Sequence, residues 1–339
     1  MKFMSLSAPG NYSIVESDLD PTMDEIALVR VISSGFCAAD DYLWSGNHPW
    51  SLAYPIVPGH ELFGEIIEID DCVQHDFPIG SKVAIQVIVP CGNCIFCLRG
   101  IKNMCQERRH FGSTFKGAFS DVVQVPRGAL MHKFPAQIDD SVGGLAETMA
   151  NAIYAVNRVG VPSDSRVLIL GMGSIGASIA VFLKFTRVDV TVSVLTSSNS
   201  KIFILRDLGI EALALDELDS HLDEFDVVME TSGHEPNFQF GIRAVKPRGT
   251  FFQYGVFKNP ISVDFNFIGE FKELTVIGGH LADDRSFERS LEFLCEHQNN
   301  LKFLISKVVG FSDFQSAFDS NGEKMFKTIF QPRFEKGSA

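Results

Sequence analysis

Short runs of β-forming residues fill the first 150 positions of the chain. Gly, Pro and Asp separate these runs, which are EIALVRVIS (25–33), LFGEIIEID (62–70), SKVAIQVIV (81–89) and FSDVVQVP (119–126). Runs of this length and composition, bounded by turn residues, are typical of an all-β, barrel-like domain. We therefore predict a β-rich domain over residues 1–150.

The pattern changes near residue 139. Residues 139–160 carry apolar side chains every three or four positions, which predicts a helix. Strand and helix patterns then alternate, from SRVLIL (165–170) and SIGASIAVFLKF (174–185) to GTFFQYG (249–255) and LTVIGGH (274–280). This alternation predicts a parallel, doubly wound α/β sheet over residues 151–282. The tail carries one amphipathic helix, 285–297, and then short strands.

Charge and composition narrow the classes of partner. The formal net charge is −13 over 339 residues, so the surface repels nucleic acid and anionic membranes. The start of the chain lacks the pattern of a secretory signal, and three glycines interrupt the uncharged stretch 167–183, which argues against a membrane span. We therefore expect a cytoplasmic protein, in which clustered cysteines bind metal before they form disulfides.

The segment GMGSIG follows a predicted strand and begins a predicted helix. It fits the pattern G-x-G-x-x-G, in which the glycines permit a tight turn, close approach of a pyrophosphate and close helix packing. The helix N-terminus adds a partial positive charge that faces the phosphates. A plain glycine turn is the alternative, but the strand–turn–helix context favours a dinucleotide site made by Gly171, Gly173, Ser174, Ile175 and Gly176.

The end of the second strand in the predicted α/β sheet, which carries VTVSVL, indicates which dinucleotide is bound. NAD sites usually have an acid there to bind the ribose 2′-hydroxyl, whereas this chain reads TSSNSK. The hydroxyls of Thr196, Ser197 and Ser198 and the cation of Lys201 suit a 2′-phosphate, so we predict a preference for NADP(H) over NAD(H). The alternative is a polar helix start with a serine cap.

Four cysteines with the spacing C-x2-C-x2-C-x7-C lie within fifteen residues. Short loops of this kind can place four sulfurs around one tetrahedral zinc, in a closed site that stabilises a fold and does not catalyse. Dense cysteines can also hold an iron–sulfur cluster, but the rest of the chain indicates hydride transfer. We predict a structural zinc held by Cys91, Cys94, Cys97 and Cys105.

A second set of possible metal ligands is spread along the chain. Cys37 comes first, then His60 and Glu61 in VPGHELFG, and then Glu147 in LAETMANA. One thiol, one imidazole and carboxylates suit a catalytic zinc that keeps one position open. Taken singly, a cysteine is more often core filling, and a histidine is more often an ordinary satisfied side chain.

Together, in this order, the motifs resemble the zinc-dependent medium-chain dehydrogenase/reductase family. The resemblance runs over nearly the whole chain and includes the segment FKGAFSDVVQVP. It implies a GroES-like catalytic domain with a structural zinc lobe, made of residues 1–150 and 283–339, and a Rossmann NAD(P)-binding domain at residues 151–282. It also implies two zinc ions per chain, hydride transfer between NAD(P)(H) and an alcohol or ketone, and a homodimer or homotetramer; with the TSSNSK segment, we expect NADP(H) as the cofactor.

Residue roles follow from the same resemblance. Cys37 and His60 match catalytic zinc ligands, Glu61 matches an acid that ligates the metal or exchanges with water, and Glu147 matches the glutamate ligand of the polyol branch. Asp40 matches the acid that orients the zinc-bound histidine. The proline that commonly follows this glutamate is missing from ETMANA.

The proton relay departs from the family pattern. Ala39 stands where a relay hydroxyl is common, and Tyr42 stands where a relay histidine is usual. The hypothesis is a relay through Tyr42, or through water held by Glu147 or Glu61. Packing is the alternative role of Tyr42.

The substrate remains open between several classes. The sequence resembles the sorbitol, threonine and cyclitol dehydrogenase branch, which implies a polyol, cyclitol or sugar (phosphate) substrate. An aromatic aldehyde reductase of the cinnamyl-alcohol type and a non-catalytic NADP(H)-binding protein are the alternatives. The resemblance implies an active site in a cleft between the two domains. Side chains near its entrance could line an aromatic pocket, stack on a sugar or pack the loop; they are Trp44, Trp50 and Tyr54. The candidates for a phosphate clamp are Arg108, Arg109 and His110, while ordinary buried or semi-buried thiols are expected at Cys72 and Cys295.

Overall fold

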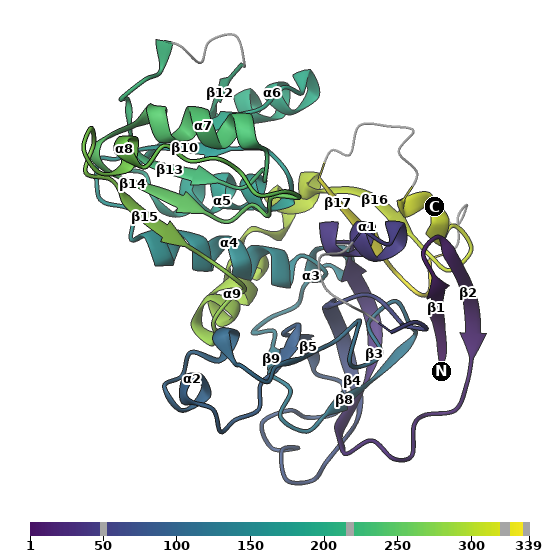
Figure 1. Ribbon diagram of the computed structural model, residues 1–339. Helices are drawn as coiled ribbons and strands as arrows, with labels where there is room; N and C mark the ends of the chain where they lie inside the picture. The colour runs from purple at the N-terminus through teal and green to yellow at the C-terminus, as the bar shows by residue number, and fades with distance from the viewer. Residues whose placement is uncertain (48–52, 215–219, 319–325, 335–339) are drawn as a thin grey trace. The chain divides into compact units, whose positions relative to one another are not determined.

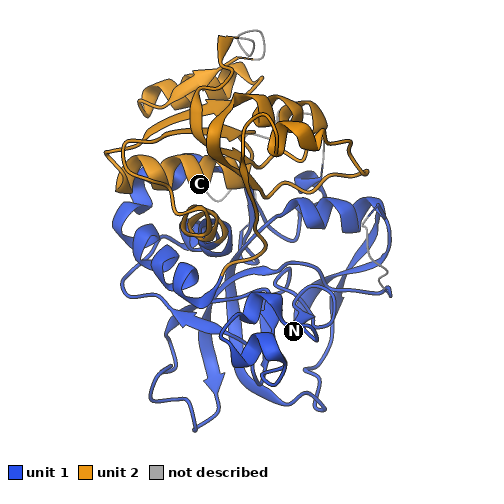
Figure 2. Ribbon diagram, turned by 60° about the vertical axis from the view of Figure 1, so that its left-hand side comes forward, with its two compact units in different colours: residues 1–150, 283–339 blue, residues 151–282 orange. Residues whose placement is uncertain are grey.

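The computed structural model describes residues 1–47, 53–214, 220–318 and 326–334. The chain divides into two compact units, one made of residues 1–150 and 283–339 and the other of residues 151–282 (Figure 2). The predicted aromatic residue Trp50 lies outside the described ranges. No helix in these ranges is long and apolar enough to cross a membrane.

The first unit is built on a mostly antiparallel sheet in the order β16-β17-β3-β4-β5-β9, with β8 paired to β3 (Figure 1). Its strands are β3 (Glu25–Gly35), β4 (Glu61–Ile69), β5 (Lys82–Ile85), β8 (Val122–Pro126), β9 (Met131–Lys133), β16 (Ile305–Val309) and β17 (Lys327–Phe330). Fully buried side chains of Val29, Ile66 and Val83 show why these runs form strands, because alternate positions fill one core. The prediction of a β-rich domain is confirmed.

The run predicted as one strand over 81–89 forms two. After β5 the chain leaves the sheet, where the Gln86 backbone donates to Leu130, and then forms β6 (Ile88–Val89), which pairs with β7 (Arg109–His110). The structure also contains a hairpin that we did not predict, formed by β1 (Lys2–Ala8) and β2 (Asn11–Glu16). Met4 of β1 is buried in a satellite core against Phe119 and Phe330.

The helix predicted over 139–160 is broken at its glycines into α3 (Asp140–Gly143) and α4 (Ala146–Val159). A Cβ on Gly143 would lie 2.5 Å from the ring of Phe63, and one on Gly144 would lie 2.9 Å from Oγ of Ser33. Close packing against the sheet therefore sets the break. The other helices of this unit are α1 (Ala38–Ser45), α2 (Ile95–Leu98), η1 (Lys102–Met104), α9 (Asp284–Leu301), η3 (Lys302–Leu304) and η4 (Phe314–Ala317).

The second unit is a parallel sheet in the order β12-β11-β10-β13-β14-β15 (Figure 1). The strands are β10 (Arg166–Leu170), β11 (Thr191–Leu195), β12 (Glu211–Leu213), β13 (Phe225–Glu230), β14 (Val245–Gln253) and β15 (Thr275–Gly278), and the helices are α5 (Ser174–Thr186), α6 (Asn199–Asp207), α7 (Glu235–Ala244) and α8 (Phe265–Ile268). The strand order reverses between β10 and β13, which is where doubly wound folds bind ligands. The predicted Rossmann domain is confirmed.

Candidate active site and cofactor site

The first unit brings three of the predicted zinc ligands together. Cys37 directly precedes α1, and His60 and Glu61 lie at the start of β4. One ligand atom from each of these residues lies within 4.8 Å of the other two. Gly35 pairs with Glu61 across the ladder, and a Cβ there would lie 2.2 Å from a carboxylate oxygen of Glu61, so only glycine leaves room for this acid.

Asp40 joins two of these residues. One carboxylate oxygen accepts a hydrogen bond from the Cys37 backbone N–H at 2.9 Å, and the other lies 3.8 Å from Nδ1 of His60. Burial raises the pKa of Asp40, although the charge of His60 opposes this. Burial would lower the pKa of His60, but Asp40, Cys37 and Glu61 outweigh it and hold that pKa well above its usual range. The geometry suits an acid that orients an imidazole.

Lys327 is a residue of this site that the sequence analysis did not identify. Its Nζ lies 2.6 Å from Oε1 of Glu61 and donates to the Phe36 carbonyl at 3.0 Å, while Thr148 Oγ1 donates to Oε2 of Glu61 at 2.9 Å. The signal was a lysine inside the apolar run FKTIF, because a lysine buried in a strand requires an anionic partner.

Glu147 lies in the first turn of α4 and is 6% exposed. It is outside the group of ligand atoms formed by Cys37, His60 and Glu61. Its charge nevertheless contributes to the raised pKa of Lys327; burial opposes that shift and Glu61 is its main cause. Glu147 therefore belongs to the electrostatic surroundings of the same site.

Tyr42 and Ala39 both lie on α1, which follows Cys37 directly. The Tyr42 side chain is partly exposed. Its hydroxyl forms no hydrogen bond within the described ranges, so the geometry leaves the relay hypothesis to experiment.

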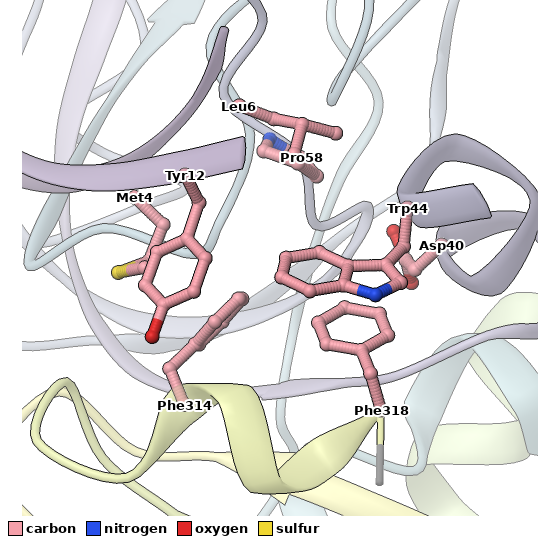
Figure 3. A pocket seen from close by; sticks show the side chains of 8 residues that line it. All are labelled: Met4, Leu6, Tyr12, Asp40, Trp44, Pro58, Phe314 and Phe318. Carbon is pink, nitrogen blue, oxygen red and sulfur yellow. The ribbon is translucent and has the colours of Figure 1, made fainter. Parts of the chain in front are cut away.

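The aromatic residues near α1 pack against one another (Figure 3). Trp44 stacks on Phe318 with ring centroids 4.4 Å apart, and it also contacts Tyr12 at 5.4 Å. The Tyr54 hydroxyl donates to the Leu43 carbonyl at 3.0 Å. Of the three roles considered for Trp44 and Tyr54, these contacts favour loop packing.

A small cavity lies among these rings, with room for about one water molecule. Its lining is Met4, Leu6, Tyr12, Asp40, Trp44, Pro58, Phe314 and Phe318. Oδ1 of Asp40 has no hydrogen-bond partner in the described part of the chain. The cavity is too small for a substrate, so it does not support an aromatic substrate pocket at this position.

The four clustered cysteines also come together. The sulfurs of Cys91 and Cys97 are 4.0 Å apart, as are those of Cys94 and Cys105, and all four lie within 4.8 Å of one another. Zinc–thiolate bonds of 2.3 Å in a tetrahedron require sulfur–sulfur edges of about 3.8 Å, so the residues fit one zinc ion. Backbone N–H groups of Cys97 and Gln106 lower the pKa of Cys94 to about 6, which favours the thiolate.

The basic residues after this lobe have local partners. Arg108 donates to the Cys105 carbonyl at 3.1 Å, and Arg109 lies 4.8 Å over the ring of Phe115. These contacts give no support to a phosphate clamp at Arg108, Arg109 and His110.

The glycine-rich turn of the second unit joins β10 to α5. Gly171 has φ +97°, and a Cβ there would lie 2.7 Å from Cβ of Ser232. A Cβ on Gly176 would lie 2.0 Å from the Gly171 carbonyl oxygen, whereas a Cβ on Gly173 would meet no atom within 4 Å. The turn is thus tight at its first and third glycines and open at the second, in front of the N-terminus of α5 and its residues Ser174 and Ile175. This shape fits a pyrophosphate.

The polar segment after β11 begins α6. Ser198 caps this helix, and its Oγ accepts from the Lys201 backbone N–H at 3.2 Å. Thr196 is buried, and its Oγ1 accepts from the Ser198 backbone N–H at 3.3 Å. The capping role weighed for Ser198 is therefore present, while Ser197 is exposed beside it.

Comparisons with known proteins agree with this architecture. Residues 23–136 match the family model of the alcohol dehydrogenase GroES-like domain, and residues 145–331 match that of the glucose dehydrogenase C-terminus. The two domains define a zinc-type medium-chain dehydrogenase. The chain belongs to the alcohol/polyol dehydrogenases of this family, as the resemblance of its motifs predicted; it is an oxidoreductase that uses zinc and a nicotinamide cofactor on a small-molecule alcohol.

Individual relatives cover nearly the whole chain. Sorbitol dehydrogenase of Halalkalibacterium halodurans is 28% identical over 337 residues, which is 95% of this chain and 96% of the relative. Erythritol/L-threitol dehydrogenase of Mycolicibacterium smegmatis is 28% identical over 302 residues, which is 83% of each. A crystal structure from Sinorhizobium meliloti, described as a zinc-binding dehydrogenase bound to NADP, has the same fold, with a TM-score of 0.87 at 24% identity over 98% of this chain and 99% of that one.

Proposed function

We propose that this enzyme transfers hydride between NADP(H) and a polyhydroxy alcohol or ketone, a polyol, cyclitol or sugar (phosphate). The convergence of Cys37, His60 and Glu61 carries the proposal, because one thiol, one imidazole and one carboxylate are the donors of a catalytic zinc. The names of the relatives, sorbitol and erythritol/L-threitol dehydrogenases, support the substrate class. The loop packing of Trp44 and Tyr54 weakens the case for an aromatic aldehyde.

The ligands proposed for this zinc are Cys37 and His60, with either Glu61 or Glu147 as the third, so that one position stays open for substrate. When bound, the metal polarises a carbonyl or lowers the pKa of an alcohol. The protein's own contribution is orientation and charge: Lys327 and Thr148 hold the Glu61 carboxylate, while the Asp40 carboxylate lies at ion-pair distance, 3.8 Å, from Nδ1 of His60. Tyr42 is the proposed proton donor to the substrate oxygen.

A second zinc is proposed at Cys91, Cys94, Cys97 and Cys105, where it would be structural. All four positions of a tetrahedron are filled by sulfur, so no position remains for substrate. The two units thus have distinct roles in the proposal: the first, with both metals, is the catalytic domain, and the second is the cofactor domain.

The preference for NADP(H) is proposed on the segment after β11. No acidic residue lies in the segment 196–201 after Leu195. Ser197, Ser198 and Lys201 offer donors and a positive charge to a 2′-phosphate. Competition between NADPH and NADH in a binding titration tests it, and equal or tighter binding of NADH would refute it.

A homodimer or homotetramer is proposed from the resemblance and from the edge strand β15. This strand is the last in the described sheet order, and its Val276 is 47% exposed next to Phe271, which is 59% exposed. An exposed strand edge with apolar side chains favours pairing with a second copy. Light scattering coupled to size-exclusion chromatography tests the proposal, and a monomer at micromolar concentration would contradict it.

An initial-rate screen of the zinc-loaded enzyme tests the reaction itself. Loss of NADPH or NADH is followed with ketoses, ketose phosphates, inososes and aromatic aldehydes. Turnover of a polyhydroxy ketone with NADPH is expected. Turnover confined to aromatic aldehydes would instead assign the enzyme to the cinnamyl-alcohol-type reductases.

A further inference from the structure

Two polar side chains end neighbouring strands of the parallel sheet in the second unit. Glu230 is the last residue of β13 and Gln253 is the last residue of β14, and they are paired in register. Both lie at the carboxyl edge of the sheet, the same edge at which the glycine-rich turn follows β10. Neither residue is assigned a role by the proposed function above.

Glu230 is a buried carboxylate whose partners are hydrogen-bond donors. It is 0% exposed. Oε1 accepts from the backbone N–H groups of Ser232 at 2.8 Å and Gly233 at 3.0 Å, and also from the Ser232 hydroxyl. Oε2 accepts from Nε2 of Gln253 at 2.9 Å. An anion bound by several N–H groups fixes the turn 231–233 firmly to the end of its strand.

This turn supports the glycine-rich turn beside it. Thr231 Oγ1 donates to the carbonyls of Leu170 at 3.0 Å and Gly171 at 3.1 Å. Gly171 packs so closely on Ser232 that a Cβ would not fit between them. The shape of the proposed pyrophosphate site therefore depends on the turn that Glu230 holds.

The side-chain amide of Gln253 has a bonded nitrogen and an unbonded oxygen. Its Nε2 has two hydrogens, and it has two acceptors, Oε2 of Glu230 and the Gly255 carbonyl at 2.6 Å. A flipped amide would place the oxygen against both acceptors, so the orientation is determined. Oε1 is then buried without a partner among the described residues, a state that is costly unless a ligand or water supplies a donor.

The place of Gln253 at the carboxyl end of β14 indicates the ligand. In a doubly wound fold the dinucleotide crosses the switch point, with its pyrophosphate at the glycine-rich turn. The adenosine half lies towards β11, where Ser197 and Lys201 are found, so the nicotinamide half lies towards β13 and β14. We propose that Oε1 of Gln253 accepts a hydrogen bond from the nicotinamide nucleotide half of the cofactor, and that Glu230 is the positioning residue that aims it. This inference rests on the proposed NAD(P)(H)-dependent function.

Binding measurements on the full-length, zinc-loaded enzyme test the inference. Gln253→Met removes the acceptor and keeps the volume, and it should weaken NADPH binding about tenfold. Binding of adenosine 2′,5′-bisphosphate, which lacks the nicotinamide half, should be unchanged. Gln253→Asn, which keeps the amide but shortens its reach, should behave in the same way and serves if the methionine variant does not fold. Gln239→Met is the matched control, because that exposed side chain on α7 donates to the Ser262 carbonyl at 2.6 Å and is not part of the Glu230 network.

Glu230→Gln tests the positioning role. An amide in this place would turn an N–H group towards other donors, so NADPH binding should weaken, and adding Gln253→Met should cause little further loss. Equal weakening of both ligands by Gln253→Met, or unchanged NADPH binding, would overturn the inference. A wild-type enzyme that binds neither NADPH nor NADH would instead refute the proposed function.

Discussion

At the scale of single residues, the ion pair between Glu61 and Lys327 is the main electrostatic feature of the proposed metal site. Both side chains are almost fully buried, and the two residues lie far apart in the sequence. Such a pair gains little over an apolar pair of the same shape, but the loss of one partner leaves an uncompensated buried charge. Lys327 is therefore expected to matter most when Glu61 is intact.

Replacement of Lys327 by Met should lower the free energy of unfolding by about 3 kcal/mol, because it leaves Glu61 buried without its cation. Urea denaturation measures the change. The double variant Lys327→Met with Glu61→Gln should be more stable than the sum of the single variants predicts. Strict additivity would show that the two charges do not interact.

Replacement of Tyr42 by Phe should lower turnover about 100-fold without changing the zinc content, because it removes only the hydroxyl proposed to pass a proton. Steady-state kinetics and metal analysis measure the two quantities. Tyr54→Phe is the control, since that hydroxyl already donates to the Leu43 carbonyl. Unchanged turnover in the Tyr42 variant would give this residue a packing role.

At the scale of elements, the sequence was informative about strands and weak about their ends. Apolar runs in β3, β4 and β10 identified buried strands, and the glycine-rich turn lay where its motif placed it. The break between α3 and α4 could not be predicted, because Gly143 and Gly144 are required by contacts with Phe63 and Ser33, which are distant in sequence. The contact of Lys327 with Glu61 could not be predicted either, because these two residues are also distant in sequence.

One contact between elements carries a measurable pH dependence. His132 on β9 bonds Gln86 at 2.9 Å and stacks on Phe287 of α9 at 4.8 Å. Burial lowers the pKa of His132 from 6.5 to about 4; Asp284 opposes this shift and Lys102 adds to it. His132 also lines a hollow whose charged residues are Asp76, Lys133, Glu288 and Glu292.

This histidine should destabilise the fold as the pH falls from about 6.5 to about 4. In that window His132 is protonated in the unfolded chain but neutral in the native protein. The free energy of unfolding therefore falls by up to about 1.4 kcal/mol for each unit that the pH falls. His132→Phe should reduce this slope in denaturation curves. His75→Phe should leave it unchanged, because the His75 side chain is fully exposed. An equal slope in wild type and His132→Phe would refute the assignment.

At the scale of the whole molecule, the proposal assigns two zinc ions different tasks within one unit. The chain leaves that unit at residue 150 and returns at residue 283, so its core is assembled from both ends of the sequence. The sequence predicted two sets of metal ligands, and the fold brings together Cys37, His60 and Glu61 in one and the four clustered cysteines in the other, whereas Glu147 lies outside the first group. It could not show that the last strand of the returning segment, β17, carries the cation beside the proposed catalytic site.

Substitution of one cysteine in each set should separate the two metals. Wild type should contain two zinc ions per chain, and Cys37→Ser and Cys97→Ser should each contain one. Loss of the closed site in Cys97→Ser should lower the thermal midpoint, because four thiolates no longer hold the lobe 91–105. Cys37→Ser should abolish turnover with a smaller change in the midpoint.

Metal analysis, calorimetry and initial rates on the same preparations measure these outcomes, with Cys295→Ser as the control. The Cys295 sulfur lies near the Ala136 carbonyl at 3.8 Å, in neither metal group. One zinc in wild type that survives Cys97→Ser would show that the lobe binds no metal. If the wild type contains one zinc, and this zinc is kept in Cys37→Ser but lost in Cys97→Ser, the proposed catalytic site holds no zinc. That result would refute the proposed chemistry, whatever the cofactor binding shows.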